Sequence, residues 1–222
     1  MAKAKAASKK ANATATDATM VVIERPAKQN VSVRIVGKTR LVVNRFPEKA
    51  RHMIAGKQAG EKVARTKRVP KEEYLGSMYL LPSKKGKSLR YGFPAGGLKK
   101  AITAAGYRVC DIPMTQSNGW FFIQGEPCIE DGFSAVDCVE VIGTPQMRTD
   151  VVHIGQGKSD LRYRAEFVEW KMDLSIEFKP DRISLKSLVN LIDHAGDGVG
   201  IGEWRVEKKG DWGRFQVAVA KG

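Results

Sequence analysis

Residues 162–178 read RYRAEFVEWKMDLSIEF, and their alternation of apolar and polar side chains decides the fold. Pro180 ends this segment, and Ser184 is a good N-cap for a helix that runs through His194. Period-two alternation is the pattern of a strand with one buried face, and its apolar residues are Phe167, Trp170, Met172, Leu174, Ile176 and Phe178. The helix has an apolar stripe at i, i+3, i+4 and i+7, made of Leu185, Leu188, Val189 and Ile192.

A glycine-rich stretch at residues 196–202 follows this helix, and residues 213–219 (GRFQVAV) have the composition of a closing strand. Strand, helix, glycine-rich loop and strand make half of a split β-α-β ferredoxin-like unit. Earlier in the chain, residues 31–36 (VSVRIV) alternate as a half-buried strand does, and helices are predicted at residues 47–65 and 95–105. The sequence therefore predicts an α+β fold with a ferredoxin-like core.

The chain is long enough for one good-sized domain. Residues 1–19 are mainly Ala, Lys, Thr and Ser and predict a disordered basic tail, so we expect the domain to span residues 20–222. Two strand-like segments, residues 120–123 and 136–142, flank an acidic loop. These segments predict a β-rich insertion, at about residues 107–160, packed on the main sheet.

Charge is divided unevenly along the chain. The formal net charge is +14, from 38 Lys and Arg against 24 Asp and Glu. Residues 1–110 carry 25 basic and 6 acidic side chains, a net of +19, whereas residues 111–222 carry 13 and 18, a net of −5. A basic working face in the first half is expected of a protein that binds nucleic acid. An anionic membrane is a weaker candidate partner, because no basic amphipathic helix with bulky aromatic anchors is present.

Several classes of protein are disfavoured by the same sequence. Its cysteines, Cys110, Cys128 and Cys138, are odd in number and form no CxxC pair, which disfavours a disulfide framework and a zinc knuckle. The N-terminus lacks the apolar core of a signal peptide, and no apolar run approaches the ~20 residues of a membrane-spanning helix. We expect a soluble, cytoplasmic protein with no metal and no cofactor.

The predicted helix at residues 47–65 is surrounded by basic side chains. Only Glu48 and Glu61 oppose them. A charge run on a helix is usually a solvated face, but an almost purely basic one favours contact with phosphates. The cations are Lys49, Arg51, Lys57, Lys62, Arg65, Lys67 and Arg68.

Gly196, Gly198, Gly200 and Gly202 have the spacing GxGxGxG. A dinucleotide-binding fingerprint follows a strand and opens a helix, whereas these glycines follow a helix and precede a strand, so the Rossmann interpretation fails. Two interpretations stay open. One is a loop whose backbone N–H groups approach a phosphate or another backbone closely; the other is a helix C-cap followed by a bulged hairpin.

Three stretches together resemble the RAMP superfamily of CRISPR-associated RNA-binding proteins. Residues 33–46 (VRIVGKTRLVVNRF) are similar to the opening strand of that family. Residues 93–102 (FPAGGLKKAI) are similar to its Pro-Gly-small-small-Leu-Lys segment, and residues 213–217 (GRFQV) follow the glycine-rich loop as in the family. The chain also resembles a class of phage and prophage proteins at residues 148–170 and 198–215, which would place it in the cytoplasm of a bacterial host.

The resemblance implies an RRM-type core that grips single-stranded RNA or DNA by its backbone, and copies that stack head to tail along the strand. Tyr91, Phe93 and Trp204 could stack bases, although Phe93 is better explained as a core residue. The candidate contacts are Lys38, Arg40, Arg45, Arg51, Lys57, Arg65, Lys99, Lys100, Gly198, Gly200, Gly202, Trp204, Arg205 and Arg214.

Two other function classes are kept as alternatives. A RAMP-type endoribonuclease would need an acid or base, and the histidines are His52, His153 and His194, of which His153 lies near Asp150 and Asp160 in sequence. A structural or virion-assembly protein would associate with itself without nucleic acid. We predict non-catalytic, largely sequence-independent binding of single-stranded nucleic acid by an oligomer, in phage replication, annealing or strand protection.

Overall fold

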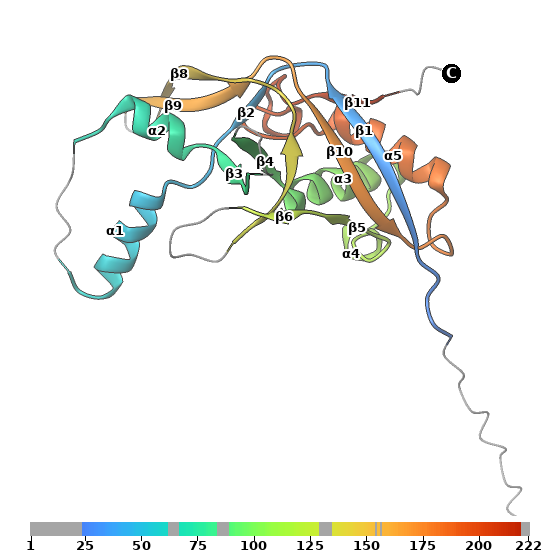
Figure 1. Ribbon diagram of the computed structural model, residues 1–222. Coiled ribbons are helices and arrows are strands. Elements are labelled where there is room, and N and C mark those ends of the chain that lie inside the picture. Colours follow the sequence, from blue (N-terminus) through green and yellow to red (C-terminus); the bar gives the residue numbers. More distant parts are fainter. Residues whose placement is uncertain are drawn as a thin grey trace, which may run out of the picture.

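The computed structural model describes residues 24–61, 67–83, 89–128, 135–153, 155 and 157–218. The predicted basic tail lies outside these residues, as does the predicted start of the domain at residue 20. The described chain has a mixed α+β fold, as the sequence predicted, and its strands form three antiparallel sheets (Figure 1). No helix within the described ranges is long and apolar enough to span a membrane.

The main sheet, sheet A, has the strand order β11-β1-β10-β5, and every neighbouring pair is antiparallel. Along the chain the order is strand, helix, strand, strand, helix, strand, which is the ferredoxin-like split β-α-β arrangement. Its elements are β1 (Gln29–Gly37), α3 (Ala95–Cys110), β5 (Phe121–Gln124), β10 (Lys171–Phe178), α5 (Leu185–Gly198) and β11 (Phe215–Val217).

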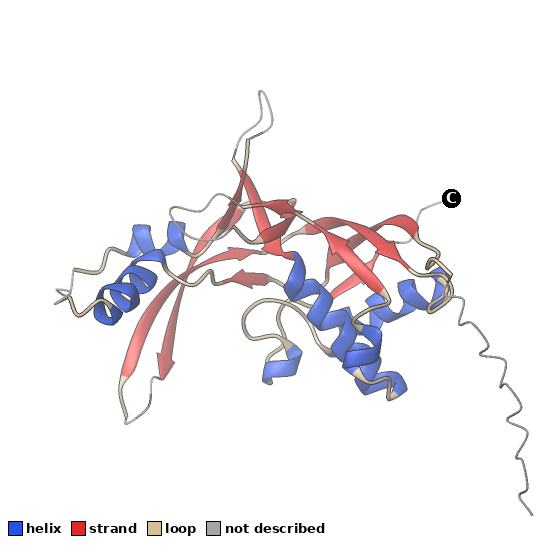
Figure 2. Cartoon of the chain, turned by 90° about the horizontal axis from the view of Figure 1, so that it is seen from below, coloured by secondary structure: helices blue, strands red, loops and turns tan. Residues whose placement is uncertain are grey.

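Helices α3 and α5 pack together on one face of sheet A, and Figure 2 shows the helices gathered on one side of these strands. The Ser184 hydroxyl caps α5 by accepting a hydrogen bond from the Ser187 N–H, as its position in the sequence predicted. Alternate residues of β10 point into the core because side chains of a strand alternate between its faces. The largest fully buried side chains are Phe121, Phe167, Phe178, Phe215, Ile35, Leu41, Leu81, Leu98, Ile102, Met172, Leu174 and Ile176.

The opposite face of sheet A is polar and its charges are paired. Arg34 on β1 makes two hydrogen bonds, of 2.6 and 2.8 Å, to Asp173 on β10. Phe122 on β5 is the large exposed aromatic of this face, and the Lys99 ammonium lies 4.3 Å from its ring centroid. An RRM-type sheet stacks bases on two or three aromatics of its open face. The open face here lacks such a platform among the residues described.

Two long segments leave sheet A and build two further sheets. Sheet B has the order β2-β9-β8, and sheet C has the order β3-β4-β7-β6. The segment at residues 38–94 contains β2 (Leu41–Val43), α1 (Glu48–Gln58), α2 (Pro70–Gly76), β3 (Tyr79–Leu81) and β4 (Arg90–Pro94). The segment at residues 125–170 contains β6 (Glu126–Pro127), β7 (Asp137–Val141), β8 (Pro145–His153) and β9 (Ser159–Phe167). The short elements α4 (Met114–Ser117) and η1 (Val206–Lys208) complete the fold.

The structure corrects several predicted boundaries. The strand expected over residues 162–178 is two strands, β9 and β10, in different sheets. The chain turns between them because Trp170 is buried and donates an Nε1–H hydrogen bond of 2.8 Å to the Thr39 carbonyl oxygen. Helix α1 ends at Gln58 rather than at residue 65, and α3 continues to Cys110. The predicted insertion at residues 107–160 overlaps β5, a strand of sheet A.

Candidate nucleic-acid interface

The loop that follows α5 folds back tightly on its own chain. The Ile201 N–H donates to the Gly213 carbonyl at 3.0 Å, and the Trp212 N–H donates to the Trp204 carbonyl at 3.1 Å. The Gly213 N–H donates to the Arg40 carbonyl, which ties the loop to the segment between β1 and β2. A Cβ atom at Gly210 would lie 1.8 Å from the Trp204 carbonyl oxygen, so only glycine fits there. These contacts explain the density of glycines by the packing of the loop on itself.

The predicted glycines therefore have different roles. Gly198 lies in the last turn of α5, so the helix extends into the predicted glycine-rich loop. Gly200 and Gly202 have φ angles of +71° and +78°, which L side chains rarely adopt. A Cβ atom at Gly202 would lie 2.5 Å from the Val42 carbonyl oxygen. The close backbone approach expected of this loop is made to its own chain; contact with nucleic acid at these glycines stays a prediction.

The same loop holds two tryptophans against each other at the surface. The ring centroids of Trp204 and Trp212 are 5.8 Å apart and their planes are inclined at 52°. Trp204 is 47% exposed and has a φ of +54°. A bulky residue in this left-handed region is strained, and such strain is concentrated at functional sites. The loop thus presents an aromatic ring to solvent at a conformational cost.

Two arginines from distant parts of the sequence lie on Trp212. The guanidinium carbon of Arg148, on β8, is 4.3 Å from the Trp212 ring centroid, and that of Arg40 is 5.8 Å away. The four residues Arg40, Arg148, Trp204 and Trp212 form what we call the Trp–Arg surface. Guanidinium groups bind phosphates and indole rings stack on bases, so this surface offers both contacts that a single strand needs.

Glu166 on β9 holds the two arginines in place. Its Oε1 accepts hydrogen bonds from Nη1 of Arg40 at 2.6 Å and from Nη1 of Arg148 at 3.1 Å. Burial acts to raise the pKa of Glu166, but the hydrogen bonds from Arg40 and Gln146 and the nearby guanidinium charges bring the pKa below its ordinary value. Glu166 therefore stays ionised near neutral pH and fixes both guanidiniums beside Trp212.

The charges beneath the Trp–Arg surface are not balanced. Arg148 Nε also donates to Asp150 Oδ1 at 2.8 Å. Arg164 on β9 is only 9% exposed, and its Nε and Nη1 atoms have no hydrogen-bond partner among the described residues; Nη1 lies 3.9 Å from Asp150 Oδ2. Three arginines thus face the two carboxylates of Asp150 and Glu166, which leaves a net positive charge that attracts an anion.

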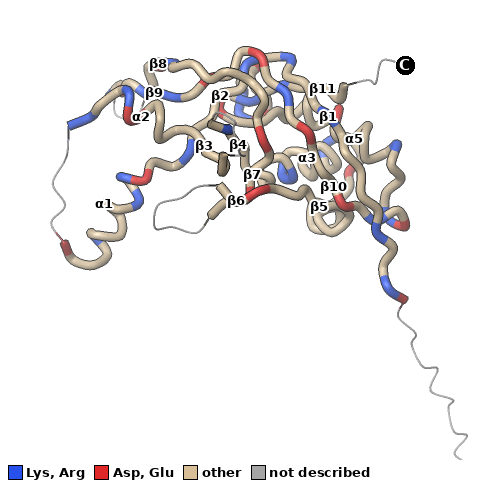
Figure 3. The backbone as a smooth tube through the Cα atoms, viewed as in Figure 1, with Lys and Arg blue, Asp and Glu red and all other residues tan. Residues whose placement is uncertain are grey.

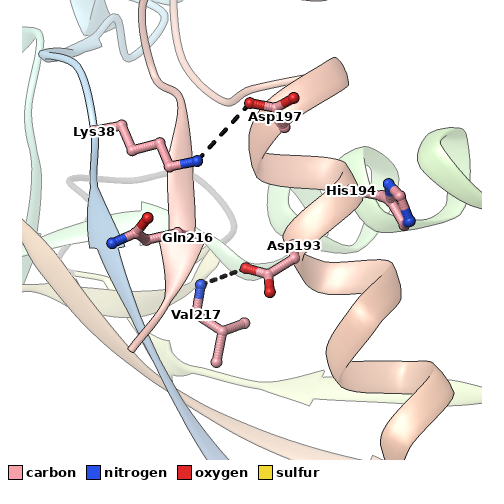
Figure 4. A pocket seen from close by; sticks show the side chains of 6 residues that line it. All are labelled: Lys38, Asp193, His194, Asp197, Gln216 and Val217. Atoms are coloured by element: carbon pink, nitrogen blue, oxygen red, sulfur yellow. Dashed lines mark hydrogen bonds and ion pairs between the residues drawn. The ribbon is translucent and has the colours of Figure 1, made fainter. Parts of the chain in front are cut away.

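Three of the predicted cations are paired with carboxylates nearby. Lys38 and Arg214 both contact Asp197 at the end of α5, and Arg205 makes hydrogen bonds of 2.7 and 2.9 Å to Glu207. Lys38 and Asp197 line an open pocket of about 320 Å³ between β11 and α5 (Figure 4). The ion pairs position these side chains but partly neutralise them.

The remaining predicted cations lie elsewhere in the fold. Arg51 and Lys57 are on α1, which extends away from the sheets and carries several basic residues (Figures 1 and 3). Lys99 and Lys100 are on α3, and burial lowers the pKa of Lys99. Arg45 lies between β2 and α1, where its N–H donates to the Ser77 carbonyl. Arg65 falls outside the described residues. The structure therefore does not bring the predicted cations into one patch.

The sequence reasoning missed Trp212 and Arg148, together with two exposed lysines of the same loop, Lys208 and Lys209. Neither lysine forms an ion pair with any described residue. The sequence Gly-Asp-Trp-Gly at residues 210–213 was a usable signal, because a glycine on each side of Asp211 and Trp212 indicates a tight turn. The approach of Arg148 had no signal in the sequence.

The histidines considered for catalysis are dispersed. His153 pairs with Ser159, and its Nδ1 lies 3.1 Å from the Ser159 hydroxyl. Asp150 lies three residues before His153 on β8, and Asp160 pairs with its neighbour Val152. Both aspartates therefore lie on the other face of the β8–β9 hairpin, because side chains alternate between the faces of a strand. His194 is on α5 and is one of the residues that line the pocket beside Lys38 (Figure 4). Among described residues, no group of three His, Cys, Asp or Glu side chains could hold a metal ion.

Comparison with known proteins gives a single kind of similarity. No protein-family model matches the chain, and no curated protein matches it. The fold is similar to that of Cmr6 from Pyrococcus furiosus, with a TM-score of 0.41 and 11% sequence identity over 86% of this chain and 99% of that one. A TM-score this low adds nothing to the functional case, which rests on the residues of the chain itself.

Proposed function

We propose that the chain binds single-stranded RNA or DNA at the Trp–Arg surface, without catalysis and largely without regard to sequence, within a RAMP-type fold. The observation that supports this most is the position of Arg148, 4.3 Å from the ring of Trp212 and beside the half-exposed ring of Trp204. Bases of a duplex are stacked on one another, so an exposed indole favours a strand whose bases are free.

The cations around the two rings supply the electrostatic part of binding. Arg40 and Arg148 lie against Trp212, and Lys208 and Lys209 follow Trp204 in the same loop. Together these side chains carry four positive charges, of which those of Arg40 and Arg148 are partly neutralised by Glu166 and Asp150. Each phosphate that is neutralised releases condensed counterions, and the affinity should therefore fall steeply as salt is raised.

The proposal is tested by fluorescence anisotropy with labelled single-stranded RNA, single-stranded DNA and duplex DNA of one length over a salt series. We expect salt-sensitive binding to one or both single strands and weaker binding to the duplex. Equal, weak binding to all three ligands would refute the proposal. It would show that the basic residues attract any polyanion without preference for a single strand.

A further inference from the structure

Strand β8 forms an unpaired edge of sheet B. It is nine residues long and pairs with β9 on one side, and no described strand lies on its other side. A long edge strand presents a row of free N–H and C=O groups to another chain. Figure 1 shows β8 at the outer margin of the molecule, above β9.

The hydrogen bonds of sheet B show which residues of β8 face this edge. The Glu203 N–H donates to the Val42 carbonyl, so the backbone N–H and C=O groups of Val42 point away from β9. Those of its neighbours in β2 point toward β9. Ala165 of β9 accordingly faces β2, and its N–H donates to Ser77 Oγ at 2.8 Å on that side. Met147 is the partner of Ala165 in the β8–β9 ladder, and its backbone N–H and C=O groups must therefore point away from β9.

The direction of the backbone groups alternates along a strand. Met147, Thr149 and Val151 therefore all present their N–H and C=O groups to the free edge. An antiparallel strand could accept and donate hydrogen bonds at each of these three positions without disturbing the ladder between β8 and β9.

The sequence of β8 is complementary to itself about Thr149. If two copies pair antiparallel with Thr149 opposite Thr149, Arg148 faces Asp150 and Met147 faces Val151 on both sides of the centre. Opposite charges and apolar pairs placed directly across two strands are stabilising. Met147 and Val151, the apolar members of this pairing, are 51% and 63% exposed.

From this complementarity we infer that β8 is the interface with a second copy of the chain, in a two-fold symmetric dimer centred on Thr149. The symmetry is isologous, since each copy uses the same surface. It differs from the head-to-tail order that the family resemblance implies. A two-fold axis perpendicular to the sheet keeps equivalent faces on the same side, so the two Trp–Arg surfaces would share one face of the joined sheet.

The dimer is tested by sedimentation of the full chain, without nucleic acid, over about a hundredfold range of concentration. We expect a monomer–dimer equilibrium for the native sequence. Thr149→Pro removes the central edge donor but no hydrogen bond to β9, and it should give a monomer with an unchanged circular dichroism spectrum. A native chain that stays monomeric at all concentrations, or a Thr149→Pro variant that dimerises like the native chain, would overturn the inference.

A cysteine series tests the register and remains informative if the proline variant misfolds. In a background in which the exposed Cys110 is replaced by serine, Thr149→Cys should form a disulfide-linked dimer under mild oxidation. Directly opposed, hydrogen-bonded residues have Cα atoms about 5.5 Å apart, within the range of a disulfide. Val151→Cys is the matched control, since its two copies would be about 13 Å apart along the strands. Equal cross-linking of the two variants would overturn the register. Because no nucleic acid is present, these outcomes are independent of the proposed function.

Discussion

Replacing Trp204 by alanine removes the exposed ring of the Trp–Arg surface while leaving the loop that carries it. The backbone carbonyl of Trp204, which accepts the Trp212 N–H, is retained in the variant. The Trp204 ring lies beside Trp212 at a tilt of 52°, and about half of the residue is open to solvent, so the indole has surface available for a base. The substitution therefore separates base stacking from the integrity of the loop.

The expected magnitude follows from this single stacking contact. Stacking of one base on an aromatic side chain contributes ~1–3 kcal/mol, which corresponds to an increase in Kd of about 5- to 150-fold. Alanine, like tryptophan, has a Cβ atom that disfavours a positive φ, so replacing Trp204 by alanine does not relieve the backbone strain at this position. We expect Trp204→Ala to weaken binding of a labelled single strand within this range, and Trp204→Phe to restore part of the loss.

Phe122→Ala is the matched control, because Phe122 is an exposed aromatic on the open face of sheet A. A strand bound at the Trp–Arg surface should not detect this change. Native affinity for Trp204→Ala combined with weakened binding for Phe122→Ala would show that the strand crosses sheet A instead. Thermal unfolding of both variants establishes that they are folded before their affinities are compared.

Four further results are expected. The double variant of Lys208 and Lys209 to alanine should lower the magnitude of the slope of log affinity against log salt by about 1.4, since each phosphate contact on a single strand contributes about 0.7. The pKa of Glu166 is lowered in the folded state, so its contribution to stability is present above the ordinary carboxyl pKa of about 4.3 and is lost as pH falls through the folded value. In the Glu166→Gln variant, the free energy of unfolding from urea melts should therefore fall less steeply between about pH 6 and about pH 3 than in the native chain. Gly198→Ala, in helix α5 with no atom within 4 Å of the added Cβ, should keep or raise stability by up to ~1 kcal/mol. Gly213→Ala should lower stability by more than ~1–2 kcal/mol, because its φ is +66° and its Cβ would meet the Ile201 carbonyl.

These results have matched controls and opposing outcomes. Alanine at Lys179 and Lys186, near the other end of α5, should leave the salt slope unchanged. If both double variants had the same slope of log affinity against log salt, the loop that carries Lys208 and Lys209 would not be part of the interface. A Glu166→Gln variant that loses stability on acidification as the native chain does would show that the carboxylate is not held by its arginines. Equal stability of the two glycine variants would contradict the tight folding of the loop.

The core of the fold was predictable because it depends on local pattern. The alternation that ends at Phe178, the cap at Ser184 and the apolar stripe of α5 each specify an element through neighbouring residues. The break near Trp170 was missed, although the alternation of apolar residues changes phase between Phe167 and Trp170; the turn itself is held by the hydrogen bond from Trp170 to the distant Thr39 carbonyl. Boundaries of this kind depend on tertiary contacts.

The candidate site was predictable only in part, for the same reason. The cluster of glycines indicated a close backbone approach, but the partner is the chain's own Val42 carbonyl. Arg40 and Trp204 were named as candidate contacts through the family resemblance. Their convergence with Arg148 and Trp212 depends on how β8 and the loop after α5 pack, which no local pattern encodes.

The most direct test of the central claim is to map where a bound strand touches the protein. A single-stranded oligonucleotide is cross-linked to the chain by ultraviolet light, and the tryptic peptides that carry it are identified by mass spectrometry. We predict cross-links in the peptides at residues 187–205 and 210–214, which contain Trp204 and Trp212. The peptide at residues 109–148 contains both Phe122 and Arg148, so the cross-linked residue within it is located by fragmentation; cross-links confined to Phe122 would place the strand on the open face of sheet A and contradict the account.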